Sequence, residues 1–158
     1  MTRFSIRTVI SRPPEIVDRA LMIPGNSVYW NIGLKQFEVI TGRPGEAGSV
    51  ARLHYSGKGG DHILEDRLIE SEPGRRYLSR VSGPAIEAEV ETLLTPRGEK
   101  TELTLHWSGR GLRIPVRILL PLLRNSMARR AAAELETFRT LVETRGSDFS
   151  SAGPPPEA

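Results

Sequence analysis

The stretch from Arg113 to Arg145 constrains the fold of this chain more than any other. Its apolar residues recur at steps of three and four, the spacing of one face of an α-helix: Leu120, Leu123, Met127, Ala131, Leu135, Phe138 and Val142. Pro115 and Pro121 each remove a backbone donor, so regular helix is expected to begin near Pro121 or to kink there. Ala131 places a small side chain on the apolar face, which predicts either close packing against another element or an open space in front of the helix.

The rest of the chain predicts an antiparallel sheet. Phe4, Ile6, Thr8 and Ile10 alternate with other residues as in a strand, and helices are expected over residues 13–22 and around residues 26–31. Turn signals such as Glu72-Pro73-Gly74 leave only short connections between the later strands, which therefore pair as a meander. These strands are Leu34–Thr41, Ser49–Tyr55, Ile63–Glu72, Arg76–Ser82, Ile86–Leu94 and Thr101–Ser108.

Strand alternation also predicts which side chains face the helix, the one element long enough to cover such a sheet. Residues 86, 88, 90, 92 and 94 would face inward, as would Leu103, Leu105 and Trp107. Glu87, Glu89, Glu91 and His106 would face water. We expect one α+β domain over residues 1–145. The polar, proline-rich segment 146–158 is predicted to be a disordered tail.

Composition excludes several classes of protein. The chain has no cysteine, which rules out disulfides, thiolate metal sites and cysteine catalysis, and the cytoplasm is the expected compartment. No apolar run approaches the ~20 residues that span a bilayer, and the N-terminus lacks the apolar region of a secretion signal. The net charge of +3 says little about partners. Its distribution says more, because residues 110–130 hold six arginines and no acidic residue.

Several local patterns accompany this order of elements. They are Pro13-Pro14-Glu15-Ile16-Val17 after the first strand, Trp30 after the short helices, Gly48-Ser49-Val50 opening a strand, Glu70-Ser71-Glu72-Pro73 closing another, and Thr95-Pro96. Over residues 3–145 the chain resembles the helix-grip fold of the SRPBCC superfamily, the START-like and birch-pollen-allergen-like group, and within it the polyketide cyclase/dehydrase and lipid-transport type. The resemblance implies a seven-stranded curved antiparallel sheet wrapped around the long helix, with two short helices between strands 1 and 2. It also implies a deep pocket for an apolar or aromatic molecule. Functions vary widely within this superfamily, so fold alone settles little.

No catalytic motif of the phosphate-loop, HExxH, GxSxG or paired-carboxylate kind is present. The candidates for proton transfer are therefore single residues: Tyr55, Asp66 and His54. If Ala51, Leu53 and Tyr55 face the pocket, as we expect, Tyr55 is its polar group and His54 lies outside; the opposite facing brings Arg52 and His54 in.

Asp66 shares a strand face with Leu64 and Leu68. An inward carboxyl there would have a raised pKa and could act as an acid or base. The alternative is a salt bridge with a neighbouring arginine such as Arg80, and this is the interpretation we adopt.

The three histidines, His54, His62 and His106, lie on different predicted strands with no shared facing, so no metal site is expected, and no cofactor is indicated. Arg124 is close in helical phase to the apolar face. It either anchors an acidic group on a ligand or covers apolar surface with its stem. The residues predicted to line the pocket are Trp30, Tyr55, Leu64, Leu68, Val90, Leu105, Trp107, Leu123, Arg124, Met127, Ala131 and Leu135.

Three functions are compatible with the sequence. The first, which we adopt, is binding or carriage of a small apolar ligand such as a lipid, quinone or polyketide-like ring. The second is a cyclase- or dehydratase-like enzyme that uses Tyr55, Asp66 or His54. The third is docking on an anionic membrane through the basic, apolar segment 109–130. Nucleic-acid binding is not expected, because no aromatic stacking platform accompanies the arginines. The oligomeric state stays open between monomer and homodimer.

Overall fold

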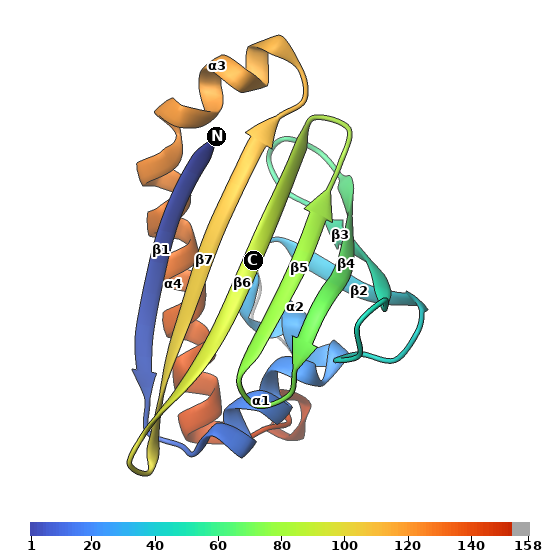
Figure 1. Cartoon of the computed structure of the whole chain (residues 1–158). Coiled ribbons are helices and arrows are strands. Elements are labelled where there is room, and N and C mark those ends of the chain that lie inside the picture. Colours follow the sequence, from blue (N-terminus) through green and yellow to red (C-terminus); the bar gives the residue numbers. More distant parts are fainter. Residues whose placement is uncertain (153–158) are drawn as a thin grey trace.

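The computed structural model describes residues 1–152, in which a seven-stranded antiparallel sheet curls around a long C-terminal helix (Figure 1). The strands are β1 (Thr2–Ile10), β2 (Leu34–Thr41), β3 (Val50–Tyr55), β4 (His62–Glu72), β5 (Arg76–Ser82), β6 (Ile86–Arg97) and β7 (Lys100–Gly111). The helices are α1 (Pro14–Met22), η1 (Pro24–Asn26), α2 (Ser27–Trp30), α3 (Ile114–Leu122), α4 (Arg124–Arg145) and η2 (Phe149–Ala152).

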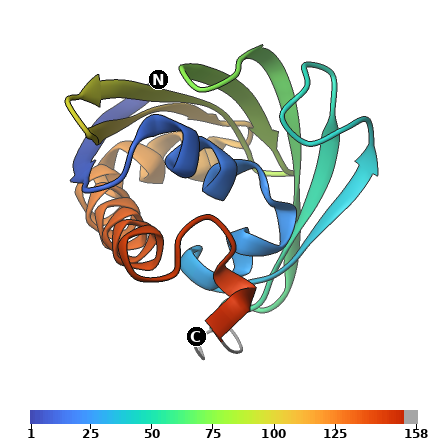
Figure 2. The same ribbon diagram turned by 90° about the horizontal axis from the view of Figure 1, so that it is seen from below.

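The sheet has the order β1-β7-β6-β5-β4-β3-β2. The chain crosses from β1 to the opposite edge through α1, η1 and α2, and then returns strand by strand to pair β7 with β1. Figure 2 shows the curled sheet with α4 beside β1 and the short helices at one end. The predicted helix-grip fold of class α+β is confirmed.

The two faces of the sheet follow the predicted alternation. Ala88 and Leu94 of β6 are buried on the inner face. On the outer face Glu89 pairs with Arg80 at 3.3 Å, and Glu91 with Arg76 at 2.7 Å. Ion pairs that stay in contact with water contribute only ~0.2–1 kcal/mol each, so most of the stability comes from the inner face.

The C-terminal helical stretch is broken at Leu123, which separates α3 from α4. Pro121 lies within α3 and has no N–H to donate to the preceding turn. The Leu123 N–H is shared between the carbonyl of Leu119, four residues earlier, at 3.2 Å and that of Leu120, three residues earlier, at 3.1 Å, an arrangement common at helix ends. The break predicted near Pro121 is therefore present, and α3 turns away from the axis of α4 (Figure 1).

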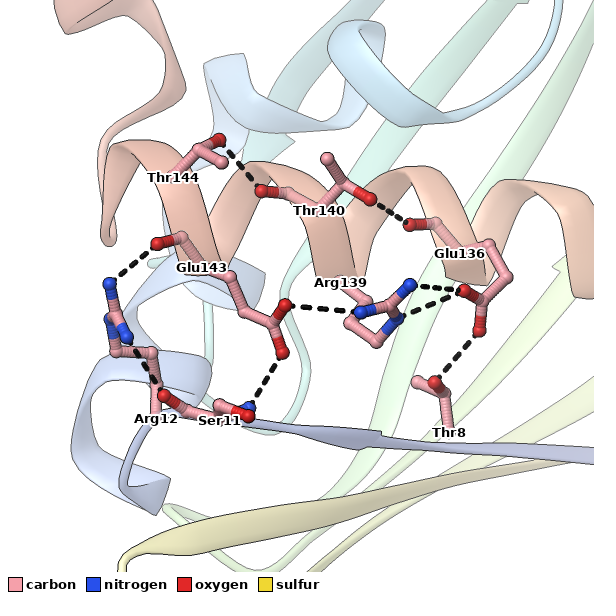
Figure 3. A network of polar contacts seen from close by, with 8 residues as sticks. All are labelled: Thr8, Ser11, Arg12, Glu136, Arg139, Thr140, Glu143 and Thr144. Carbon is pink, nitrogen blue, oxygen red and sulfur yellow. Dashed lines mark hydrogen bonds and ion pairs between the residues drawn. The ribbon is translucent and has the colours of Figure 1, made fainter.

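Polar contacts fix α4 along the edge strand β1 (Figure 3). The Thr8 hydroxyl donates to Glu136 Oε1 at 2.9 Å, and the Ser11 N–H donates to Glu143 Oε2 at 2.8 Å. Arg139 lies between the two glutamates, with nitrogen–oxygen distances of 2.8 Å to Glu136 and 3.1 Å to Glu143. The other side of α4, which carries the buried Leu135, is thereby directed at the inside of the sheet.

Residues 146–152 do not form the disordered tail that their composition predicts. Phe149 of η2 is fully buried, with its ring centroid 6.3 Å from that of Tyr29 and 5.7 Å from that of Phe138. Its N–H donates to Asn26 Oδ1 at 3.0 Å. The domain thus extends to Ala152, because one large apolar side chain can hold an otherwise polar segment against the core. The rest of the predicted tail, residues 153–158, lies outside the described residues.

Candidate ligand-binding site

A cavity of about 400 Å³ lies between the concave face of the sheet and α4. This volume is within the ~300–1,000 Å³ of typical small-molecule pockets. Its wall includes side chains of every strand from β2 to β7 and of α1, α2 and α4. Ala131 faces the cavity, so the small residue on the apolar face of α4 leaves an open space, the second of the two alternatives in the sequence.

Most of the side chains predicted to line a pocket are in this wall. They are Trp30, Tyr55, Leu64, Leu68, Val90, Leu105, Trp107, Ala131 and Leu135. The strand residues among them are brought together because inward positions recur at every second residue and the strands pair in sequence order. Their contact with a ligand stays a prediction.

Leu123, Arg124 and Met127 were predicted to line the pocket and do not. Arg124 is exposed, and its Nε donates to the Arg3 carbonyl at 2.6 Å. Met127 shares the helix face of Ala131 but lies a turn closer to α3, and Leu123 is 40% exposed at the helix break. Helical phase predicts the face on which a residue lies, but not how far along the helix the cavity extends.

The side chains of β3 that point into the cavity are those that the sequence predicted. Ala51, Leu53 and Tyr55 line the cavity, whereas His54 lies outside, with Nε2 2.9 Å from Glu38 Oε1. His54 therefore cannot transfer a proton to a molecule in the cavity. Burial, reinforced by the negative charges of Glu134 and Asp66, raises the pKa of Tyr55 to about 12, so its hydroxyl is protonated and can donate a hydrogen bond.

Asp66 also lines the cavity, and the predicted salt bridge with Arg80 is wrong. In the register of β4 and β5, Asp66 lies opposite Val81, while Arg80 points to the outer face and pairs with Glu87 and Glu89. Burial raises the pKa of Asp66 to about 6, against the opposing effect of a hydrogen bond with the Ser79 side chain.

Glu134 is a second carboxyl in the wall, and it was not among the residues predicted from the sequence. Its Oε2 accepts the Ile32 N–H at 2.7 Å, and burial raises its pKa, opposed by that hydrogen bond and by the charge of Arg130. Its position was detectable, because Glu134 lies three residues after Ala131 and four before Phe138, on the face that carries the apolar residues.

The three histidine rings each have a different partner. His54 contacts Glu38, the ring of His62 stacks on Tyr55 with 5.1 Å between centroids, and His106 Nδ1 lies 2.6 Å from the Ser5 hydroxyl. Among residues 1–152, no three histidine or carboxylate side chains are grouped as a metal site would require.

Comparisons with known proteins agree with this architecture. A solved structure from Geobacillus kaustophilus is 18% identical, with a TM-score of 0.76 over 92% of this chain and 97% of that one. One from Chromobacterium violaceum is 20% identical, with a TM-score of 0.72 over 90% and 99%. DynU16, a protein of the dynemicin biosynthetic locus, is 21% identical, with a TM-score of 0.66 over 93% of this chain and 49% of its own. At such identities the likeness shows the fold alone.

Comparison with curated proteins found no match. The family model described as polyketide cyclase/dehydrase and lipid transport matches residues 1–143. Since this match spans nearly all of the chain and the fold agrees with it, the protein belongs to the polyketide cyclase/dehydrase and lipid-transport family.

Proposed function

We propose that the protein binds and carries a small, largely apolar molecule in the cavity between the sheet and α4. The observation that carries this proposal is the cavity wall, in which aliphatic and aromatic side chains predominate. Transfer of apolar ligand surface from water to such a wall is favourable by ~25 cal/mol per Å². The description of the family, which includes lipid transport, is consistent with this function.

The chain carries its own reporter of binding. It has two tryptophans, Trp30 and Trp107, and both line the cavity. Titration with the neutral fluorophore N-phenyl-1-naphthylamine should therefore quench tryptophan emission saturably and excite the probe by energy transfer.

Two matched variants on α4 locate that binding. Ala131→Phe places a ring in the cavity and should weaken probe binding at least about tenfold, a loss of ~1.4 kcal/mol. Ala133→Phe puts the same ring on the exposed side of α4 and should bind like the wild type. The proposal fails if the probe does not bind, or if a folded Ala131→Phe variant binds it unchanged.

An enzymatic function of the cyclase or dehydratase kind has less support. Of its three candidate groups, His54 lies outside the cavity, which leaves Tyr55 and Asp66. The charge of Asp66 helps to raise the pKa of Tyr55, but no hydrogen bond joins these two side chains within the described part of the chain. Recovery of a chemically altered ligand after incubation, detected by mass spectrometry and lost in Asp66→Asn, would make the enzyme the better proposal.

A second candidate function, docking on an anionic lipid bilayer, is favoured by the surface of α3. Four aliphatic side chains form what we call the α3 apolar patch: Ile114, Ile118, Leu119 and Leu122, which are 71%, 67%, 51% and 75% exposed. Arg113 and Arg117 flank them, and residues 109–130 contain no carboxylate. Basic residues near an anionic surface contribute ~1 kcal/mol each, in addition to burial of the apolar side chains. No helix within residues 1–152 combines the length and apolar character needed to cross a membrane.

Vesicle pelleting tests this docking. We expect binding to phosphatidylserine-containing vesicles that falls with added salt and is lost in Ile118→Asp. Ile40→Asp, which changes an exposed isoleucine on β2, should bind like the wild type. Equal binding to neutral vesicles, or none to anionic ones, would overturn the proposal. A concentration-dependent dimer that Ile118→Asp abolishes would assign the α3 apolar patch to self-association instead.

A further inference from the structure

The ionisable groups that line the cavity have only one sign of charge. Asp66 and Glu134 are in the wall, together with Tyr55 and Tyr77, and no lysine, arginine or histidine is among the lining residues that the structure describes. The chain as a whole is basic, with 22 lysines and arginines against 19 acidic residues. The ionisable groups of the cavity therefore carry the opposite sign of charge to the net charge of the protein.

Basic side chains that neighbour wall residues in the sequence or in the sheet are held outside the cavity. Arg130, one turn before Glu134, donates from Nη2 to the Ile32 carbonyl at 2.7 Å and is exposed. Arg80 is paired with glutamates on the outer face of the sheet, and Arg52 is exposed on the outer face of β3. His62 contacts the ring of Tyr55 but is not part of the wall. The charge of Arg130 acts on Glu134 and Tyr55 from outside the wall, but among the described lining residues an anionic group would find no cationic side chain to pair with.

The energetic consequence is large. A carboxylate that leaves water without gaining a partner of opposite charge loses hydration that nothing in an apolar wall replaces. It would also be repelled by any ionised carboxyl of the wall, and that repulsion is stronger in an apolar cavity than in water. A free fatty acid, the simplest apolar amphiphile, is therefore poorly matched to this cavity.

The polar groups of the wall suit a hydroxyl. Asp66 and Glu134 offer carboxyl oxygens that accept hydrogen bonds, and the Tyr55 hydroxyl, which donates to no protein group in the part of the chain described, offers a donor. A hydroxyl both donates and accepts. Building on the proposed binding function, we propose that the ligand is an uncharged, mostly apolar molecule bearing a hydroxyl group, and that carboxylate-bearing molecules are selected against.

Two compounds of nearly equal size test this selection. At about pH 7.5, 2-naphthalenemethanol and 2-naphthoate differ in charge but share one ring system, and each is assayed by displacement of N-phenyl-1-naphthylamine. The wild type should bind the alcohol at least about tenfold more tightly than the anion. Asp66→Asn and Glu134→Gln should each reduce the ratio of the affinity for the alcohol to the affinity for the anion. Glu38→Gln, which removes a carboxylate from outside the cavity, should leave it unchanged.

The outcomes separate this inference from the proposed function. If the naphthoate binds as tightly as the alcohol, the inference is overturned while binding itself stands. The inference is equally overturned if the alcohol fails to displace a bound probe. It is also overturned if the ratio is unchanged in both Asp66→Asn and Glu134→Gln, since the two carboxyls then neither bind the hydroxyl nor repel the anion. If the fluorescent probe itself never binds, it is the proposed function that fails.

Discussion

The carboxyl of Asp66 should make the protein less stable as the pH rises. Its pKa is about 6 in the folded protein and near the ordinary 3.8 in the unfolded chain, so the folded state holds the proton more tightly. The stabilisation by this proton is fully present below about pH 4 and is lost as the pH rises through about 6. At 1.36 kcal/mol per pKa unit, the ionised carboxyl costs about 3 kcal/mol of folding free energy at neutral pH.

Asp66→Asn isolates this effect, because the amide keeps the shape of the side chain and can still contact Ser79. From these two pKa values, the variant should be more stable than the wild type by about 1 kcal/mol near pH 4.5 and about 3 kcal/mol near pH 7.5. The free energy of unfolding is measured by urea titration with tryptophan fluorescence. Glu134, whose pKa is raised too, is present in both proteins and cancels in the difference.

Asp61→Asn is the matched control, since Asp61 is exposed in the loop between β3 and β4. It should change the free energy of unfolding by less than about 0.5 kcal/mol at either pH. A wild type as stable as Asp66→Asn near pH 7.5, or a difference that does not grow between the two pH values, would refute the argument that Asp66 is desolvated in the cavity wall.

Two further predictions concern stability. Phe149→Ala should lower the free energy of unfolding, measured by urea titration, by ~3–5 kcal/mol because it empties a fully buried site. Ser150→Ala, at the exposed neighbouring residue, should change this free energy little. Equal effects of the two substitutions would contradict the anchoring role of Phe149. Gly33→Ala should lower the melting temperature more than Gly48→Ala does. Both glycines have positive φ, but only at Gly33 would a Cβ lie 2.9 Å from the Ser56 carbonyl oxygen, so equal shifts would show that this contact relaxes.

Those features that follow from local periodicity were predictable from the sequence alone. The alternation along β6 predicted that Glu87, Glu89 and Glu91 face water, and the apolar spacing of α4 predicted its buried side. Proline and glycine turns made the strands pair in order, which settled the fold class and brought the side chains of β3 and β4 to one concave face. Pattern suffices here because each of these properties depends on residues only a few positions apart.

Other features were decided by the tertiary structure, because they depend on which distant groups meet a side chain. Whether Asp66 faces an arginine depends on the register of β4 with β5, and that register turns Arg80 to the opposite face. Phe149 is anchored because its ring packs against that of Phe138 in the preceding helix and that of Tyr29, which lies near the other end of the chain. Periodicity predicts the face on which a residue lies. The charge and the space that the residue meets there are set by packing in three dimensions.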